Sequence, residues 1–402
     1  MTEHQHGTHE EPYDMIPTSR PIRLAQMVYA LCLGGSEVLA WRLARSLNAT
    51  GRYACSLYGI ARGGPLAELL AADGIPSYAY VRRGGIDLRL IGRLAWQLRR
   101  NGTQVVHTHH LGQLLCGGLA AKLAGAKVVH TEHDSHSLMK PRTQRLFRLL
   151  SRFADHITTV SDPVTHFLRD QIGIPSAKLQ TIPNGVLVEA FQDAPGLARE
   201  QFSWNKEDVL IGCVARLEAE KGHDILLTAF HHLQRRYPHA KLLIVGDGSL
   251  RTALRAQAKA LGIDGAVQFL GARDDIPALL ATCDMSVLPS LKEGVPLSIL
   301  EAMAAGKAVV ASAVGSIPHI VSHGETGVLV SPGDAQALEY ALASLVGDAP
   351  ARTNLGRRGQ IFVSEHYHFH RTVNAYRKVY EHGLSSVRYG IDDATAHSSA
   401  LR

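Results

Sequence analysis

Short apolar runs of strand length alternate with longer helix-like segments along most of this chain. In the first half, strands are predicted at 22–33, 53–58, 77–81, 105–107 and 128–131, and helices at 38–47, 65–72, 88–100 and 114–124. In the second half, strands are predicted at 209–214, 241–245, 267–270, 308–312 and 327–330, and helices at 223–236 and 364–382. This alternation is typical of parallel sheets covered by helices on both faces, so it predicts an α/β fold.

The length of 402 residues predicts two domains, because a single hydrophobic core rarely grows to this size. The alternation is interrupted at 188–208, where we place the domain link. We predict a disordered tail at 1–19, an N-terminal domain at 20–187 and a C-terminal domain at 188–363. A C-terminal helix is predicted at 364–385 and a flexible tail at 386–402.

Composition narrows the class of protein without selecting one partner. A hydrophobic fraction of 46% with 19% charged residues is ordinary for a globular protein. The formal net charge of +6 is compatible with anionic lipid, a phosphate-bearing substrate or nucleic acid. Nucleic-acid grooves use aromatic residues for stacking, and these make up only 6% of the chain, so we expect no nucleic-acid partner.

The cysteines and the N-terminus favour a cytoplasmic location. Five scattered cysteines without a CxxC motif indicate buried thiols in a reducing compartment. The N-terminus is His-rich and acidic, unlike a signal peptide. No apolar run approaches the roughly 20 residues that span a bilayer.

Two segments, 88–100 and 140–152, have the pattern of basic amphipathic helices. Their basic residues recur at helical spacing and are Arg89, Arg93, Arg99, Arg100, Arg142, Arg145, Arg148 and Arg152. One interpretation is an ordinary surface helix packed on a sheet. The other is docking on anionic lipid, to which each basic residue contributes roughly 1 kcal/mol. An anionic membrane surface is therefore a candidate partner, and a peripheral location at the inner face of the membrane stays open.

A strand, a tight loop and a helix are predicted near 285–303. Pro296 suits the first helical turn, because its φ fits and its missing N–H is not needed there. The backbone N–H groups of Val295, Leu297 and Ser298, together with the positive helix end, then make a site for phosphate.

Two glutamates flank this phosphate site, Glu293 in the loop and Glu301 on the second helical turn. The helical rise places them something near 10 Å apart. Glycosidase carboxyls lie roughly 5 Å apart in retaining enzymes and roughly 6.5–9.5 Å apart in inverting ones, so the pair fits neither. The two carboxylates suit opposite ends of one long ligand, with a diphosphate between a sugar and a ribose.

Other candidate residues stand at predicted strand ends, where parallel sheets bind ligands. Gly34 and Gly35 allow either close approach to a ligand or tight packing of strand on helix. Arg216 and Lys221 bracket a loop where cations and a helix start converge on phosphate. Histidines cluster at 107–110 and 130–134, in structural or catalytic roles.

Two cofactor alternatives are disfavoured. Zinc ligation by His107, His109 and His133 is conceivable, but no HExxH pattern accompanies them, so no metal site is expected. The Gly-Asp-Gly at 246–248 lacks the third glycine of a dinucleotide fingerprint, which disfavours a nicotinamide cofactor.

Two glutamates separated by seven residues, after a strand that ends in Pro289-Ser290, resemble the donor site of retaining family-4 glycosyltransferases. The resemblance covers most of the chain. It implies the GT-B fold, in which two Rossmann-like domains face each other across a cleft and a C-terminal helix crosses back to the first domain. It also implies no cofactor and no metal requirement, and no DxD motif stands at a strand end.

The resemblance implies a role for each candidate residue. Glu293 would lie at the donor sugar with His133 beside it, and Arg216 and Lys221 would stabilise the leaving diphosphate. Glu301 would bind ribose. The other implied contacts are Gly34, Gly35, Gly294, Val295 and Leu297 to the donor, the backbone near Arg273 to the base, and His109, with His133, on the acceptor side.

One position departs from the family pattern, because many relatives have Gly where Pro296 stands. Pro lacks an N–H, which leaves Val295 and Leu297 as the expected phosphate donors. The stretches 107–115 and 131–134 resemble transferases of exopolysaccharide assembly, whose acceptors are often polyprenyl-linked.

The implied function is retaining transfer of a sugar from a nucleoside-diphosphate sugar to a hydroxyl acceptor. That acceptor would be a lipid-linked or growing glycan in polysaccharide biosynthesis. The alternatives are a nucleotide-sugar epimerase of the same fold and a non-catalytic sugar-nucleotide-binding protein. The sugar, the base and the linkage stay open.

Overall fold

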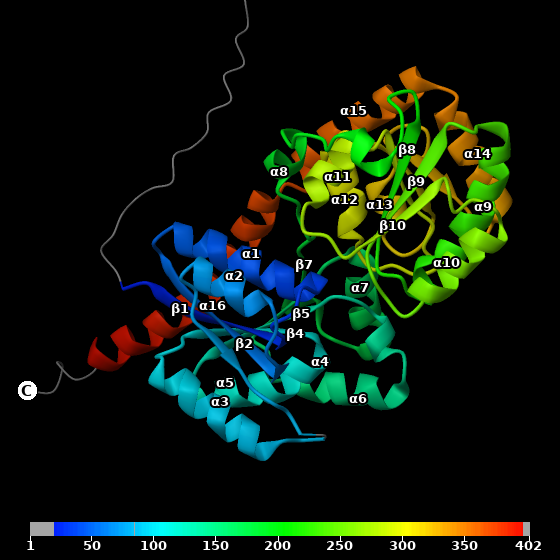
Figure 1. Ribbon diagram of the computed structural model, residues 1–402. Coiled ribbons are helices and arrows are strands. Elements are labelled where there is room, and N and C mark those ends of the chain that lie inside the picture. Colours follow the sequence, from blue (N-terminus) through cyan, green and yellow to red (C-terminus); the bar gives the residue numbers. More distant parts are fainter. Residues whose placement is uncertain (1–19, 84, 397–402) are drawn as a thin grey trace, which may run out of the picture. The chain divides into compact units, whose positions relative to one another are not determined.

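The computed structural model describes residues 20–83 and 85–396 (Figure 1). The predicted tail at 1–19 and the last residues of the predicted C-terminal tail, 397–402, lie outside the described residues. The chain divides into two compact units, each made of several segments. Among the described residues, the first unit comprises 20–83, 85–131, 146–157 and 379–396, and the second comprises 132–145 and 158–378. The predicted domain boundary at 187/188 stays a prediction.

The first sheet has seven strands in the order β3-β2-β1-β4-β5-β6-β7. Its strands are β1 (Ile22–Ala30), β2 (Tyr53–Arg62), β3 (Ser77–Ala79), β4 (Val105–His109), β5 (Lys127–Glu132), β6 (His156–Thr159) and β7 (Leu179–Thr181). The helices between and after them are α1 (Gly35–Ala49), α2 (Leu66–Ala72), α3 (Leu88–Arg100), α4 (His110–Gln113), α5 (Leu119–Ala124), α6 (Pro141–Leu150), α7 (Asp162–Phe167) and α8 (Val188–Gln192). β1 runs parallel to both β2 and β4, with Gln26 beside His107.

The second sheet has six strands in the order β10-β9-β8-β11-β12-β13. They are β8 (Val209–Val214), β9 (Ala240–Val245), β10 (Val267–Gly271), β11 (Met285–Leu288), β12 (Ala308–Ser312) and β13 (Val328–Val330). The helices are α9 (His223–Arg236), α10 (Arg251–Ala260), α11 (Ile276–Thr282), α12 (Leu297–Ala304), α13 (Ile317–Ile320), α14 (Ala335–Val346) and α15 (Ala349–His366). Strands β11 and β12 are buried along their whole length and β8 in all but its last residue, as expected for a parallel sheet covered on both faces. The predicted α/β fold with two Rossmann-like parallel sheets is confirmed.

The start of α1 differs from the prediction. The first strand ends at Ala30, and α1 begins at Gly35 instead of at residue 38. Gly34 is its N-cap with an extended backbone, so the helix starts directly after the first glycine. The predicted helix at 114–124 is also divided, because a π-helical turn at Leu114–Gly118 precedes α5.

The C-terminal helical region is broken where the sequence predicts one helix over 364–382. α15 ends at His366 and α16 (Phe369–Ala396) begins three residues later. The Val186 N–H donates to the carbonyl of Tyr367 at 2.8 Å, and the Phe369 N–H donates to the carbonyl of Val186 at 2.9 Å. These bonds interrupt the helix because they take up the backbone groups that would continue it. α16 extends past the predicted helix end at 382, and its residues from Val379 on belong to the first unit.

The five cysteines are all free thiols. Cys55, Cys116, Cys213 and Cys283 are buried as predicted, whereas Cys32 is half-buried. Burial raises the pKa of Cys213 and of Cys283 to about 12, so these thiols are unreactive near neutral pH. In the part of the chain that the structure describes, no helix is both long enough and apolar enough to cross a bilayer.

Candidate active site

Glu293 lies in the loop between β11 and α12, and two hydrogen-bond donors hold its carboxylate. Lys221 Nζ and Ser290 Oγ each lie 2.6 Å from the same oxygen, Oε1. The side chains of Glu293 and Lys221 are only 7% and 16% exposed, and Ser290 is fully buried. Ser290 therefore orients the carboxylate of Glu293. The other carboxylate oxygen of Glu293, Oε2, accepts neither of these two hydrogen bonds.

Lys221 reaches Glu293 because two strand-end loops are fixed against each other. It lies between β8 and α9, at the end of a short helical turn formed by Ala219–Lys221. The Leu291 N–H, in the loop after β11, donates to the carbonyl of Glu220 at 2.8 Å. Gly222 has a φ of +66°, and a Cβ atom there would lie 2.2 Å from the carbonyl oxygen of Pro289. Only glycine fits this close approach.

We expect Gly222→Ala to destabilise the second unit more than Gly262→Ala does. Both glycines have a positive φ, which costs alanine about 1–2 kcal/mol, but nothing lies within 4 Å of a Cβ at Gly262. The difference between the two variants in free energy of unfolding, measured by denaturant titration, reports the clash with Pro289. Equal destabilisation would show that the two loops tolerate separation.

The loop after β12 holds Glu293 and Gly294 from the other side. Both the N–H and the hydroxyl of Ser316 donate to the carbonyl of Gly294, the N–H at 3.3 Å. Gly315 has a φ of +58°, and a Cβ atom there would lie 2.1 Å from the carbonyl oxygen of Glu293. Three strand-end loops of the second sheet therefore fix the position of Glu293.

Helix α12 starts at Leu297, and Pro296 precedes it as the N-cap with an extended backbone. The prediction placed Pro296 inside the first turn, so its position is corrected by one residue. The N–H groups of Leu297 and Ser298 belong to the first turn, where no helical carbonyl accepts them. Glu301 lies one turn further along α12 and is half-buried.

Arg216 and Arg273 lie at strand ends of the same sheet, but each pairs locally. Arg216 follows β8, and its Nη2 lies 3.0 Å from Glu220 Oε1 in an exposed pair. Arg273 follows β10 and binds Asp275 through Nε at 2.8 Å and Nη2 at 2.5 Å. The hydrogen bond from Arg273 lowers the pKa of Asp275. Exposed pairs of this kind are weak, so Glu220 holds the Arg216 side chain only loosely.

A pocket of about 330 Å³ lies within the second unit beside Glu293. Glu293, Gly294 and Gly315 line one part of it, and Asp134 and Ser161 line another. His133 adjoins this lining, since its carbonyl oxygen lies 3.1 Å from the position of a Cβ on Gly294. The structure thus brings His133 and the Glu293 loop together.

The other strand-end candidates lie in the first unit. His109 ends β4 and is fully buried, with Nε2 3.0 Å from Gln26 Oε1 and its ring 4.2 Å from that of His107. Burial holds the pKa of His109 well below 6.5, so the ring is neutral. Gly34 and Gly35 stand at the N-terminus of α1. Their roles, and that of His109 on the acceptor side, stay predictions.

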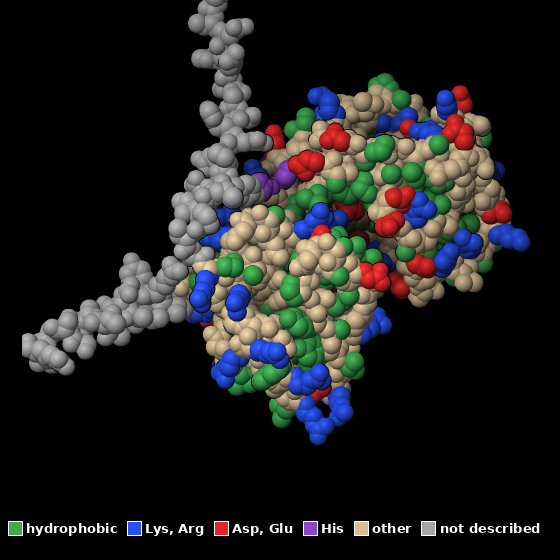
Figure 2. Space-filling model, turned by 60° about the vertical axis from the view of Figure 1, so that its left-hand side comes forward, with side chains coloured by type: hydrophobic (Ala, Val, Ile, Leu, Met, Phe, Trp, Pro, Cys, Tyr) green, Lys and Arg blue, Asp and Glu red, His purple; other side chains and the backbone are tan. Residues whose placement is uncertain are grey.

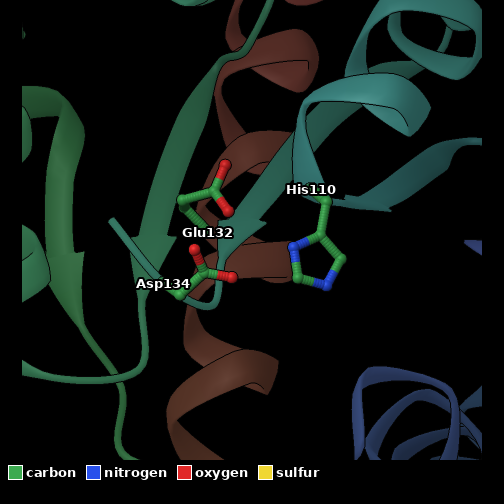
Figure 3. Close-up of side chains that lie close together, drawn as sticks. All are labelled: His110, Glu132 and Asp134. Carbon is green, nitrogen blue, oxygen red and sulfur yellow. The ribbon is translucent and has the colours of Figure 1, made fainter. Parts of the chain in front are cut away.

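A carboxylate pair follows β5. Figure 3 shows the side chains of Glu132, at the end of the strand, and Asp134, just after it, together with His110 at the start of α4. One oxygen of Glu132 lies within 4.8 Å of one of Asp134. Glu132 is fully buried and Asp134 is half-buried, and we assign no metal to them. Asp134 adds negative charge to the pocket lining.

The sequence analysis did not identify Ser290 and Ser316 as site residues. The signal for Ser290 was present, because a Ser three residues before a Glu in a tight loop can bond that carboxylate. Ser316 gave no such signal, because its contact with Gly294 spans 22 positions of sequence.

Comparison with known proteins identifies the family of the chain. Residues 33–189 match the family described as Glycosyltransferase Family 4, and residues 197–362 match Glycosyl transferases group 1. N-acetyl-alpha-D-glucosaminyl L-malate synthase of Bacillus anthracis is 28% identical over 76% of this chain and 82% of its own. A GDP-mannose-dependent phosphatidylinositol monomannoside mannosyltransferase of Mycolicibacterium smegmatis is 31% identical to this chain. The match covers 61% of this chain and 68% of the mannosyltransferase.

Solved structures agree in fold. The Anabaena protein HepE, in complex with UDP and glucose, superposes with a TM-score of 0.78 over 91% of this chain and all of its own, at 23% identity. A glycosyltransferase of Rickettsia africae superposes with a TM-score of 0.79 over 91% of this chain and 99% of its own, at 20% identity. The fold and the two family matches thus define a glycosyltransferase of the GT-B type that uses a nucleotide sugar. The chain belongs to the retaining family-4, or group 1, glycosyltransferases.

Proposed function

We propose that this enzyme transfers a sugar from a nucleoside-diphosphate sugar to a hydroxyl of a lipid-linked or growing glycan, without a metal ion. The observation that carries the proposal is the pairing of Lys221 with Glu293 directly before helix α12. A cation, a carboxylate and a helix N-terminus gather there. These are the groups that a diphosphate joined to a sugar requires.

In the proposed reaction, the chain stabilises the charge that develops on the leaving diphosphate. The bond between the anomeric carbon and the diphosphate oxygen breaks, and its electron pair leaves with the diphosphate. Lys221, Arg216 and the first N–H groups of α12 bind that charge. The acceptor oxygen forms the new bond on the same face of the sugar, and the departing diphosphate takes up its proton.

Other residues would orient the two substrates. Glu293 would bind hydroxyls of the transferred sugar through Oε2, because Oε1 is held by Lys221 and Ser290. Glu301 would bind the ribose from α12. His133 adjoins the Glu293 loop and suits a place beside the transferred sugar. The remaining donor contacts would come from Gly34, Gly35, Gly294, Val295, Leu297 and the backbone at Arg273.

The names of relatives support a lipid-linked acceptor in polysaccharide biosynthesis. A 28% identical Escherichia coli protein is named as a galactosyltransferase acting on GlcNAc-diphosphoundecaprenol. The mannosyltransferase of Mycolicibacterium smegmatis is named for a phosphatidylinositol mannoside. Two putative Bacillus subtilis glycosyltransferases, EpsF and EpsD, are 28% and 27% identical.

The proposal predicts release of a nucleoside diphosphate from one sugar nucleotide in the presence of EDTA and membrane extract. Purified full-length protein is incubated with UDP-, GDP- and ADP-sugars, with and without extract, and Glu293→Ala is run alongside. Release that needs the extract and disappears in the variant is the expected result. If EDTA abolishes release, the metal-free mechanism is wrong. Conversion of the donor to its epimer, or binding without turnover, would favour the alternative functions.

A further inference from the structure

The loop between β3 and α3, with the outer face of α3, presents apolar and basic side chains side by side. We call it the basic-apolar surface, and all of it lies in the first unit. Val81 and Leu88 are 78% and 74% exposed, and Ile86 and Trp96 are also exposed. Its exposed basic residues are Arg83, Arg89, Arg93, Arg99 and Arg100. Figure 2 shows Lys and Arg side chains gathered with hydrophobic ones in the lower part of the view.

The two faces of α3 differ in burial and in residue type. Leu90, Ile91, Leu94 and Leu98 are buried and anchor the helix in the first unit. Arg89, Arg93, Trp96 and Arg100 follow each other at three- and four-residue spacing on the exposed face. Burial of the inner face accounts for the stability of the helix, so it does not explain the exposed tryptophan and arginines.

The positive charge of this surface is not neutralised locally. Asp87 is the only acidic residue between 80 and 101, and it is buried as the N-cap of α3. Its carboxylate accepts hydrogen bonds from the N–H groups of Leu90 and Arg83 at 3.0 Å each. Among the described residues, no carboxylate lies within salt-bridge distance of Arg89 or Arg93.

Aromatic rings hold two of the guanidinium groups at the surface. The Arg100 guanidinium lies 5.2 Å from the ring centre of Trp96, and that of Arg93 lies 5.3 Å from Tyr80. At the far end of α3, Arg99 Nη2 donates to the carbonyl of Leu123, whose side chain is exposed on α5. The surface therefore continues from the loop along α3 to the end of α5.

We propose that the basic-apolar surface docks on an anionic membrane. Exposed Val, Ile and Leu at a loop tip can enter the boundary between headgroups and acyl chains. Tryptophan favours the same interface, and arginines bind the headgroup phosphates. A lipid surface fits this combination better than a protein partner does, because the apolar side chains project from an exposed loop and helix face. Docking places the enzyme where a lipid-linked acceptor is found, but it does not depend on the proposed transfer reaction.

The test is sedimentation of the full-length protein with vesicles. One set is phosphatidylcholine alone, and the other is an equal mixture of phosphatidylcholine and phosphatidylglycerol. Binding is expected only to the anionic set and is expected to weaken as salt is raised. Trp96 is much more exposed than Trp41 and Trp204, so a blue shift of emission that Trp96→Phe removes would report its entry into lipid.

Two variants separate charge from insertion. Arg89→Gln with Arg93→Gln is expected to weaken vesicle binding about thirtyfold, from roughly 1 kcal/mol per basic residue and about 1.4 kcal/mol per tenfold. Val81→Ser with Ile86→Ser and Leu88→Ser is expected to remove the binding that persists at high salt. Arg357→Gln with Arg358→Gln and Ile361→Ser alters an exposed basic-apolar site on α15 of the second unit and is the matched control.

Thermal melts of each variant exclude unfolding as the cause of lost binding. The proposal is overturned if the natural protein does not sediment with anionic vesicles, or if the α3 variants bind them as the control does. Equal binding to both sets would also overturn it, because the arginines would then have no role. Glu293→Ala should bind vesicles normally, so a failure of the proposed reaction is distinguishable from a failure of docking.

Discussion

Replacing Lys221 with alanine is expected to lower kcat by about 10²–10³-fold, the usual cost of losing one preorganised group that stabilises transition-state charge. Lys221 Nζ is already 2.6 Å from Glu293, so its position does not depend on substrate. Because charge on the diphosphate grows as the bond breaks, kcat should fall more than KM rises. Initial rates of nucleoside diphosphate release over a range of donor concentrations measure both.

The chain offers a matched control for this substitution. Lys241 Nζ lies 3.9 Å from Asp208 Oδ1, and these side chains are 17% and 8% exposed, almost as in the Lys221–Glu293 pair. Lys241 stands in β9, outside the loops that hold Glu293. Lys241→Ala should therefore leave kcat within a few-fold of the natural enzyme. A similar loss in both variants would assign the effect of Lys221→Ala to the folding of the second unit.

Glu293→Gln is expected to reduce turnover by one to two orders of magnitude. The amide keeps the size of the side chain and an oxygen for Ser290, but it removes the charge that Lys221 contacts. Hydrogen bonds to a charged group are worth about 1.5–3 kcal/mol, which corresponds to the expected range. Because the proposed contact of Glu293 is with the sugar, affinity for the intact donor should fall more than affinity for the nucleoside diphosphate alone.

Calorimetric titration with the donor and with the nucleoside diphosphate tests this difference in affinity. Asp208→Asn, which removes the carboxylate of the comparable buried pair, is the control. An equal loss of affinity for both ligands would place Glu293 at the diphosphate instead of at the sugar.

The fold was predictable because its elements follow from local periodicity. Strands β8 and β12 and helices α3 and α9 begin and end at the predicted residues. In these segments the apolar pattern and the turn residues agree, so tertiary contacts need not shift the ends. The loop that carries Glu293 was predictable for the same reason, since Pro296 and the apolar face of α12 mark the helix start.

Features that depend on distant contacts were not predictable. The break between α15 and α16 arises from backbone bonds to Val186, and the burial of His109 follows from its contacts with Gln26 and His107. The close fit of Gly222 against Pro289 depends on the meeting of two loops. Arg216 lies in the predicted loop, but its pairing with Glu220 is a matter of side-chain conformation that sequence does not fix.

The contacts of Tyr380 constrain the order in which the parts of the first unit can fold. Its hydroxyl lies 2.7 Å from Nδ1 of His107 and 3.4 Å from Nε2 of Gln26, and all three side chains are fully buried. A buried polar atom left without its partner costs about 1–3 kcal/mol. Strands β1 and β4 leave the ribosome long before Tyr380 is made, so this interior must stay hydrated or loosely packed during synthesis. Strands that emerge early from the ribosome are therefore completed by a residue made 273 positions after His107, and the interior of this unit cannot close until α16 has been synthesised.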